Sequence, residues 1–296
     1  MADYGKLVAR AMEALTSSRA APIRGLPQTP LQVGDRMIVP APSAELRNLA
    51  EDYMRATGRP YQPVENYVPI DVERAKAIAK AYEDMPHAPH DPTVQRSYDA
   101  LAKETRDQYE VLKRLGVKIE PMPAGIDPYA ATPRLANRDY LENRHFNYFP
   151  TEGGYGSGQV IDTSANPLLQ PSGVKIAGRE VPYNDLFRIV HDFFGHFKEG
   201  LGFRAAGEEN AWRSHSRMYS DAALPAMTAE LRGQNSWLNY GPHGEANRSA
   251  KAADTIFAPQ KSGVMPPWAV NLGRLTPLGV AGAATLPELA DQMKSR

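Results

Sequence analysis

Apolar side chains recur at helical spacing along most of the chain, and this periodicity predicts a mainly α-helical protein. Capping residues mark the ends of several predicted helices: Ser43 opens one, Asp91-Pro92 opens a longer one, and Gly116 ends the latter. In chain order, the predicted helices cover residues 3–18, 43–57, 71–85, 91–116, 132–144, 184–196, 206–219, 222–232 and 286–294.

Short strands are predicted between these helices, where apolar or aromatic residues alternate with polar ones. The candidates are residues 36–39, 117–120 and 145–149, and the longest irregular region runs from Pro150 to Pro182. A glycine-rich loop of that length is either a lid or a surface excursion. We therefore expect a mainly α fold with a few short strands. A single domain over residues 43–296 would follow an extension over residues 1–42 that holds one helix and a proline-rich segment.

The composition narrows the class of protein. Lys plus Arg and Asp plus Glu both number 34 in 296 residues, so the formal net charge is zero and nothing indicates nucleic-acid binding. The absence of cysteine excludes disulfides, thiolate metal ligands and thiol nucleophiles. No apolar run is long enough to span a membrane, and the N-terminus lacks the apolar core of a secretory signal. These features predict a soluble, cytoplasmic protein that is not secreted.

Two of the seven histidines lie five positions apart in the segment His191-Asp-Phe-Phe-Gly-His196, inside an apolar helical run. Sheltered imidazoles need partners for their nitrogen atoms, and a divalent metal is one such partner. On a regular α-helix, residues i and i+5 point about 140° apart, so the two rings cannot share a metal there. We expect a π-bulge or a bend at Gly195, where it costs least. The alternative is a pair of core histidines that bond to backbone carbonyls or nearby carboxylates.

Glu230 is the candidate for a third ligand because it interrupts an apolar helical segment, Ala226-Met-Thr-Ala-Glu-Leu231. A carboxylate in that setting is costly unless it is paired or bound to a metal. Glu208 and Glu209 lie near the start of the preceding helix, where acidic residues are ordinary. They belong either to surface ion pairs or to groups that orient metal ligands, and His215 in the same helix is a candidate replacement ligand.

Two histidines and one carboxylate, with coordination positions left open, form the ligand set of non-haem Fe(II) oxygenases. The same set binds zinc in hydrolases, where Glu208 or Glu209 would be the general base that activates a metal-bound water. The segment after Glu230 is rich in amides and aromatic residues. It is a candidate for lining a substrate pocket through three of its side chains, Gln234, Asn235 and Trp237.

The segment His191–His196, together with Thr228-Ala-Glu230, resembles the metal-binding motifs of the pterin-dependent aromatic amino-acid hydroxylases. The resemblance covers only the part of the chain that holds these motifs. It implies a helical, basket-shaped, hydroxylase-like domain in which His191, His196 and Glu230 bind iron. It also implies tetrahydropterin as the electron donor.

The same resemblance implies further site residues. Asp192 takes the place of the acidic residue that lies close to the pterin, although it is one methylene shorter than the Glu of that family. Phe149 is the candidate for stacking on the pterin, and Arg134 is the candidate for binding the substrate. The whole chain also resembles uncharacterised phage-encoded proteins, which implies phage structural proteins as partners and a location in the host cytoplasm or the virion.

Three functions remain, and they differ in what surrounds the histidines. The leading interpretation is an Fe(II)-dependent oxygenase, which needs open coordination positions, a pocket for a small-molecule substrate beside Asp192, and tetrahydropterin or a 2-oxoacid as electron donor. A zinc hydrolase needs a carboxylate within reach of a metal-bound water. A non-enzymatic virion or scaffold protein would have a closed site, or histidines bonded to the backbone.

Overall fold

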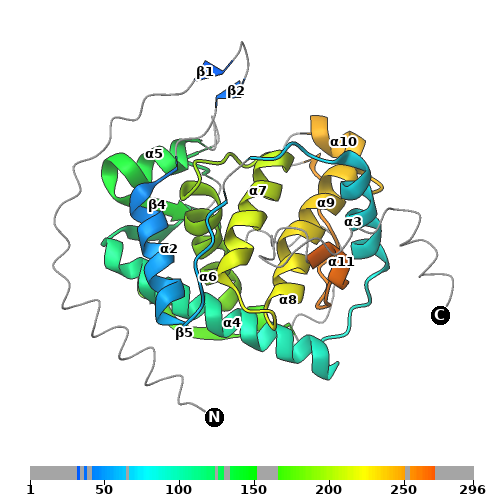
Figure 1. Cartoon of the computed structure of the whole chain (residues 1–296), viewed down its shortest axis with the longest axis horizontal. Helices are drawn as coiled ribbons and strands as arrows, with labels where there is room; N and C mark the ends of the chain where they lie inside the picture. The colour runs from blue at the N-terminus through cyan, green and yellow to red at the C-terminus, as the bar shows by residue number, and fades with distance from the viewer. Residues whose placement is uncertain are drawn as a thin grey trace.

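The computed structural model describes residues 42–64, 67–123, 126–129, 134–151, 166–250 and 254–270, together with the backbone of residues 32–33 and 37–38. Within this part the protein is mainly helical, as predicted (Figure 1). The helices expected at residues 3–18 and 286–294 lie outside the described residues.

Helical segments make up most of the described chain, and several α-helices continue directly into a turn of 3₁₀- or π-helix. In chain order they are α2 (Ala44–Ala56), α3 (Val72–Asp84), α4 (Pro92–Leu112), η1 (Lys113–Leu115), α5 (Arg134–Asn143), η4 (Pro167–Leu169), α6 (Tyr183–His191), η5 (Asp192–Phe197), α7 (Ala205–His215), η6 (Ser216–Met218), α8 (Leu224–Thr228), η7 (Ala229–Gly233), α9 (Gln234–Tyr240), α10 (Gly244–Ser249) and α11 (Pro267–Val270). No helix of the described residues has the length and apolar character needed to cross a bilayer.

The described strands are short, and each pairs with one other strand. The pairs are β1 (Gln32–Val33) antiparallel to β2 (Met37–Ile38), β3 (Lys118–Pro121) parallel to β4 (His145–Tyr148), and β5 (Pro171–Ile176) antiparallel to β6 (Arg179–Pro182). The three strands predicted from alternation are therefore confirmed as β2, β3 and β4, within one or two residues.

The predicted capping residues stabilise the helices as expected. The Ser43 hydroxyl accepts a hydrogen bond from the Leu46 backbone N–H (3.3 Å), and the Asp91 carboxylate accepts one from the Thr93 backbone N–H (2.7 Å). Gly116 has a φ of 63°, in the left-handed region that glycine tolerates, and it ends the α4–η1 segment. Local chemistry therefore sets where these helices begin and end.

The region from Pro150 to Pro182 contains more structure than the sequence predicted. The described part holds η4 and the hairpin of β5 and β6, so the prediction of one long irregular segment is wrong there. Along β5 the side chains alternate between exposed and buried, which is the periodicity of a strand with one face on the core. The apolar positions are few, and the pattern is correspondingly faint in the sequence.

Two helix boundaries also differ from the prediction. The helix predicted to start at Asn184 begins one residue earlier, at Tyr183, and the Asn184 amide donates a hydrogen bond to the Thr151 hydroxyl (3.0 Å). The helix expected to end at Arg232 instead continues through η7 and α9 to Tyr240. The chain after Glu230 is therefore helical rather than a helix end.

The core consists of two clusters of buried apolar side chains, and α6 separates them. Leu186, Ile189 and Val190 pack into the cluster formed with α2, α5 and β4, whereas Phe187 packs into the cluster formed with α3, α8 and α9. In Figure 1, α6 and α7 lie in the middle of the molecule, and the long helix α4 passes beneath both sides. Residues at the end of α6 are therefore placed between the two halves of the core.

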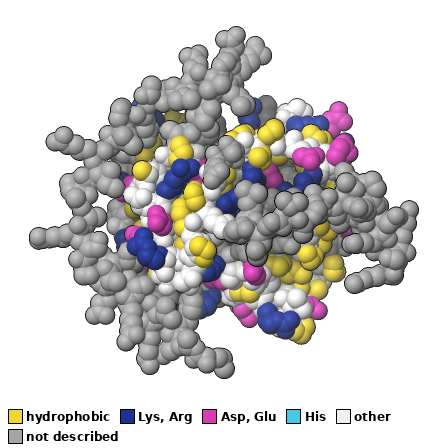
Figure 2. Space-filling view, viewed as in Figure 1, with side chains coloured by type: hydrophobic (Ala, Val, Ile, Leu, Met, Phe, Trp, Pro, Cys, Tyr) yellow, Lys and Arg dark blue, Asp and Glu magenta, His cyan; other side chains and the backbone are white. Residues whose placement is uncertain are grey.

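The face of the molecule in Figure 2 carries Lys or Arg and Asp or Glu side chains interspersed over its described part. This mixture agrees with a formal net charge of zero.

Candidate metal centre

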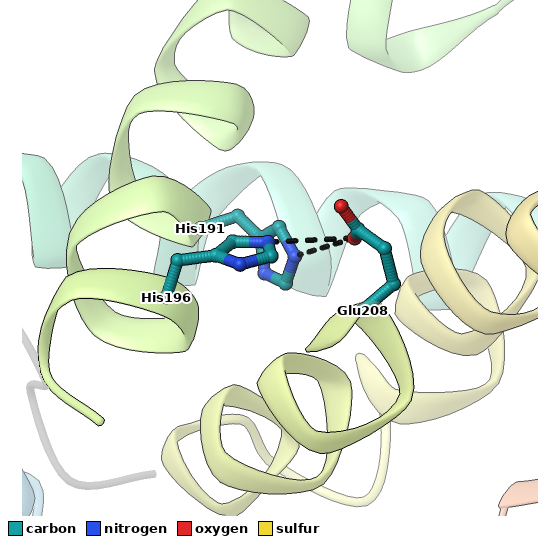
Figure 3. Close-up of side chains that lie close together, drawn as sticks. All are labelled: His191, His196 and Glu208. Atoms are coloured by element: carbon teal, nitrogen blue, oxygen red, sulfur yellow. Dashed lines mark ion pairs between the residues drawn. The ribbon is translucent and has the colours of Figure 1, made fainter. Parts of the chain in front are cut away.

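The two histidines of the His191–His196 segment meet a carboxylate, and that carboxylate is Glu208. One ligand atom from each of the three residues lies within 4.8 Å of the other two. Oε2 of Glu208 is 3.4 Å from Nε2 of His196 and 3.8 Å from Nε2 of His191. Figure 3 shows both rings directed at the same carboxylate oxygen, with the histidines on one helix and Glu208 on the next.

A π-helix brings the two histidines together, as the sequence predicted. His191 is the last residue of α6, and His196 lies in the π-helix η5. The wider turn is visible in the backbone hydrogen bond from the Lys198 N–H to the Phe193 carbonyl, which spans five residues (2.8 Å). The two rings consequently lie 4.9 Å apart, centre to centre, on one face of the segment.

Two glycines make room for this arrangement. A Cβ at Gly195 would lie 2.8 Å from Cε1 and Nδ1 of His191, so the ring rests on the glycine backbone. A Cβ at Gly207 would lie 1.7 Å from the carbonyl oxygen of Gly202, where the start of α7 crosses the preceding loop. Gly207 thus allows the close crossing that places Glu208 opposite the histidines.

The nitrogen atoms that face Glu208 have no hydrogen-bond partner among the described residues. This holds for Nε2 of His191 and Nε2 of His196, and the two side chains are 6% and 1% exposed. An unpaired buried polar atom costs roughly 1–3 kcal/mol. A metal ion between the two Nε2 atoms and the Glu208 carboxylate would remove this cost, so the donor set fits a divalent cation of the iron or zinc type.

The charges of the three groups are complementary. Burial raises the pKa of Glu208, but the two imidazoles outweigh it and hold that pKa well below its usual value. Burial lowers the pKa of His191, whereas in His196 the attraction of Glu208 outweighs burial and raises the pKa. Glu208 is therefore ionised at neutral pH, which a carboxylate must be to bind a metal.

The cluster opens onto a cavity of about 440 Å³. Aromatic side chains form much of its wall, among them Phe146, Phe187 and Phe203. Cavities of this size and lining bind small molecules. The metal position and a volume fit for a substrate thus lie side by side.

Asp192 and Glu230, both predicted as site residues, also line this cavity. Burial raises the pKa of Asp192 to about 7, although the nearby His196 opposes the shift. Burial likewise raises the pKa of Glu230 to about 7, against hydrogen bonds that lower it. Those bonds come from the Tyr98 hydroxyl and, at 2.7 Å, from the Gln234 amide. The structure therefore places Glu230 in the cavity but outside the group that contains the two histidines.

Phe149 and Gln234 are the other predicted site residues that line the cavity. Phe149 is 43% exposed, and the Arg188 guanidinium lies 5.9 Å from its ring centre. This position suits a stacking side chain at the edge of the cavity.

The remaining predicted site residues are not among those that line the cavity. Both oxygens of Glu209 accept hydrogen bonds from Arg232, at 2.5 and 2.8 Å. The Trp237 indole donates to Glu83, and Asn235 accepts from Asn239. The contacts of Glu209 and Trp237 hold helices together and that of Asn235 lies within α9, so they explain the residues without a ligand.

Arg134 is the first residue of α5, and its side chain lies outside the described part of the structure. Its predicted role in substrate binding remains a prediction.

His215, expected as a replacement ligand, lies behind the centre instead. Its Nδ1 is 3.1 Å from Nδ1 of His191, and its Nε2 is 2.8 Å from the amide oxygen of Gln108. Sequence reasoning did not identify Gln108, although a polar side chain on the buried face of α4 was a signal. It assigned Glu208 to an ordinary first-turn position. Gly207, immediately before Glu208, was the sign of a close backbone approach.

The chain matches no protein-family model, no curated protein and no solved structure. Its function is therefore argued from the chemistry of the site.

Proposed function

We propose that this protein is a non-haem iron oxygenase in which His191, His196 and Glu208 bind Fe(II). The observation that carries the proposal is the convergence, at the wall of a cavity, of one ionised carboxylate and two buried Nε2 atoms that have no hydrogen-bond partner among the described residues. Three protein ligands of this kind leave coordination positions open, which is the arrangement of Fe(II) oxygenases. Bound there, Fe(II) supplies the activation of molecular oxygen.

The side chains of the cavity would hold the substrate. The aromatic side chains of the cavity favour a planar molecule, Phe149 offers a further ring at the edge, and the polar side chains between them, such as Arg188 and Gln234, offer hydrogen bonds. Asp192 lies beside the metal ligands and carries a proton below about pH 7, so it can donate a hydrogen bond to a bound molecule. The hydroxylase-like resemblance supports tetrahydropterin as electron donor and a basket-shaped fold, with Glu208 in the place that the resemblance gave to Glu230.

A zinc hydrolase is the second candidate, and Asp192 favours it. Its carboxyl group directly follows the ligand His191 and lines the same cavity, the place where a general base would be needed. Glu208 is itself a ligand in this arrangement, and Glu209 is bound by Arg232, so neither takes the role of base that the sequence suggested. Asp192 would have to act alone on a metal-bound water.

The virion or scaffold alternative predicted a closed site or histidines bonded to the backbone. The cavity beside the histidines and their unpaired Nε2 atoms support a binding site instead.

Metal content tests the proposal. Wild type, His196→Ala and His90→Ala are loaded without oxygen, with Fe(II) or with Zn(II) in separate samples, then desalted and assayed by elemental analysis. His90 is an exposed histidine far from the site in sequence and serves as the matched control. We expect about one iron per chain in wild type and His90→Ala, and none in His196→Ala.

The same samples separate the candidates. Oxygen consumption by the iron form with tetrahydropterin supports the oxygenase, whereas hydrolysis of ester or amide substrates by the zinc form alone supports the hydrolase. Circular dichroism and thermal unfolding of the metal-free proteins show whether His196→Ala is folded. No metal in folded wild type overturns both proposals.

A further inference from the structure

A chain of buried polar groups runs from His191 to the long helix α4. Nδ1 of His191 is 3.1 Å from Nδ1 of His215, and Nε2 of His215 is 2.8 Å from Oε1 of Gln108. Gln108 and His215 are wholly buried, and His191 is 5% exposed. The chain therefore links α4, α7 and α6 through side chains that have no access to water.

The amide of Gln108 sets the direction of the hydrogen bonds in this series of side chains. Its Nε2 lies 3.5 Å from the backbone carbonyl of Met218 and donates to it, so its Oε1 is the atom that faces His215. A carbonyl oxygen only accepts hydrogen bonds. The hydrogen between Gln108 and His215 must consequently reside on Nε2 of His215.

His215 is neutral in this setting, because aromatic rings surround it. Phe187, Phe194 and Tyr219 have ring centres within 6.5 Å of the His215 ring, and a buried charge there would be costly. A neutral imidazole with a hydrogen on Nε2 has a lone pair on Nδ1. That lone pair accepts the hydrogen of the facing Nδ1 of His191.

We propose that Gln108 and His215 are positioning residues that hold His191 in its Nδ1–H tautomer, with the lone pair of Nε2 directed at the metal position. The inference rests on the proposed metal centre and deepens it. An imidazole coordinates a metal only through an unprotonated nitrogen, and the hydrogen bond made by the other nitrogen decides which one that is. Gln108 thus selects the tautomer of His191 through the ring of His215, before any metal binds.

His196 is held differently. Its ring stacks on Phe203, with centres 4.1 Å apart and planes 15° from parallel, and neither of its nitrogens has a hydrogen-bond partner among the described residues. Packing orients this ring, and no series of buried side chains like that behind His191 is described for it. The two histidine ligands therefore differ: hydrogen bonds in the folded protein set the tautomer of His191, whereas packing sets only the ring orientation of His196.

Nuclear magnetic resonance of the ¹⁵N-histidine-labelled, metal-free protein reads the tautomers directly. We expect the Nδ1–H form at His191 and the Nε2–H form at His215. In Gln108→Met, which removes the acceptor with little change in shape, we expect both rings to show mixed tautomers. An Nε2–H form of His191 in the wild type overturns the inference, whether or not the protein binds metal.

Affinity for Zn(II), measured by competition with a chelator, tests the consequence. His215→Leu removes the acceptor for His191 and should weaken binding about 10- to 100-fold, the usual effect of losing a partner of a metal ligand. His215→Asn keeps an acceptor oxygen near the position of Nδ1 and should restore affinity to within about threefold of wild type. Rescue of this kind is not expected if His215 only fills space.

Thr105→Val is the matched control, because it removes a buried hydrogen bond on the same face of α4 (2.8 Å to the Tyr219 hydroxyl) without touching the chain to His191. It should lose stability but keep its affinity for Zn(II). Equal affinity of His215→Leu and wild type overturns the inference. If the wild type binds no metal, the proposed function fails, and the tautomers in the metal-free protein still decide whether Gln108 and His215 act as inferred.

Discussion

Glu208 and Glu230 line the same cavity, yet the protein holds them in opposite ways. Two imidazoles face Glu208 and keep its pKa well below the usual value against the effect of burial. Glu230 accepts hydrogen bonds from two neutral groups, the Tyr98 hydroxyl and the Gln234 amide, and burial raises its pKa to about 7 although Arg188 opposes the shift. The comparison shows that the kind of partner, and not burial alone, decides the charge of a carboxyl group.

This difference suits the two groups to different tasks. A metal ligand must have lost its proton, and Glu208 has done so at any pH where the protein is expected to work. Glu230 keeps its proton below about pH 7, so it is a hydrogen-bonding group for a molecule in the cavity rather than an anion. From the sequence, we expected a carboxylate on an apolar helix to be paired with a charge or bound to a metal. Glu230 shows a third possibility, in which the pKa is raised and neutral groups hydrogen-bond to the carboxyl group.

The largest expected effect comes from exchanging the two carboxyl groups for amides. Glu208→Gln should weaken the binding of Fe(II) or Zn(II) more than about 100-fold, because it removes the charged ligand of the cluster. Glu230→Gln should change the affinity less than about threefold, since Glu230 lies outside that cluster. Isothermal titration or chelator competition measures both values.

The comparison breaks if the order is reversed. A large loss in Glu230→Gln with a small one in Glu208→Gln would restore Glu230 as the third ligand, as the resemblance to the pterin-dependent hydroxylases implied.

A smaller effect is expected from the glycines of the two π-helices. Cβ atoms at Gly195 in η5 and Gly233 in η7 would lie 2.8 Å from the His191 ring and 2.6 Å from the Tyr82 ring, respectively. Either substitution by alanine should destabilise the protein by about 1–2 kcal/mol, since overpacking costs more than the gain in helix propensity. Urea unfolding measures this loss.

Only Gly195→Ala should also impair metal binding, by about tenfold, because it displaces a ligand ring. Gly233→Ala is its control, matched in backbone and in crowding. Equal metal affinities in the two variants would mean that the His191 ring does not depend on Gly195 for its place.

Much of this fold was predictable because its signals are local. The caps at Ser43 and Asp91, the glycine at the end of η1 and the distortion at Gly195 each depend on a few neighbouring residues, and all are confirmed. The hairpin of β5 and β6 was missed, because its alternation involves few apolar residues. Its two-residue turn at Ala177-Gly178, where both residues have positive φ, was the local signal for it.

The site was predictable only in part, for the same reason. His191 and His196 share one segment, so their spacing and Gly195 revealed them. Glu208 reaches them through the packing of α7 on η5, and Gln108 reaches them from a helix some 80 residues earlier in the chain. Apart from the adjacent Gly207, the local sequence around Glu208 is that of an ordinary acidic residue in a first turn. Tertiary packing determines that Glu208, rather than Glu230, lies next to the two histidines.

The smallest expected effect is on the pH dependence of the free energy of unfolding. It is also the most direct measure of the difference between Glu208 and Glu230. The pKa of Glu230 rises from 4.5 to about 7 on folding, so the folded state binds the proton more tightly than the unfolded state. The contribution of Glu230 to the free energy of unfolding is therefore fully present below pH 4.5 and is lost as the pH rises through 7. Because the Glu230 side chain keeps some exposure to solvent, we expect this contribution to be about 1–2 kcal/mol. The full pKa shift would correspond to roughly 3 kcal/mol.

The amide in Glu230→Gln cannot titrate. Between pH 5 and pH 8, the free energy of unfolding of the variant should therefore rise by about 1–2 kcal/mol relative to that of wild type. Urea unfolding of the two metal-free proteins measures this change. A constant offset between the two is expected as well, since an amide meets Tyr98 and Gln234 differently, and only the change with pH carries the argument. Asp192 titrates in both proteins and cancels in the difference. Parallel stability curves would show that Glu230 is ionised throughout. The two carboxyl groups would then be alike in charge, and the choice of Glu208 as ligand would rest on its position alone.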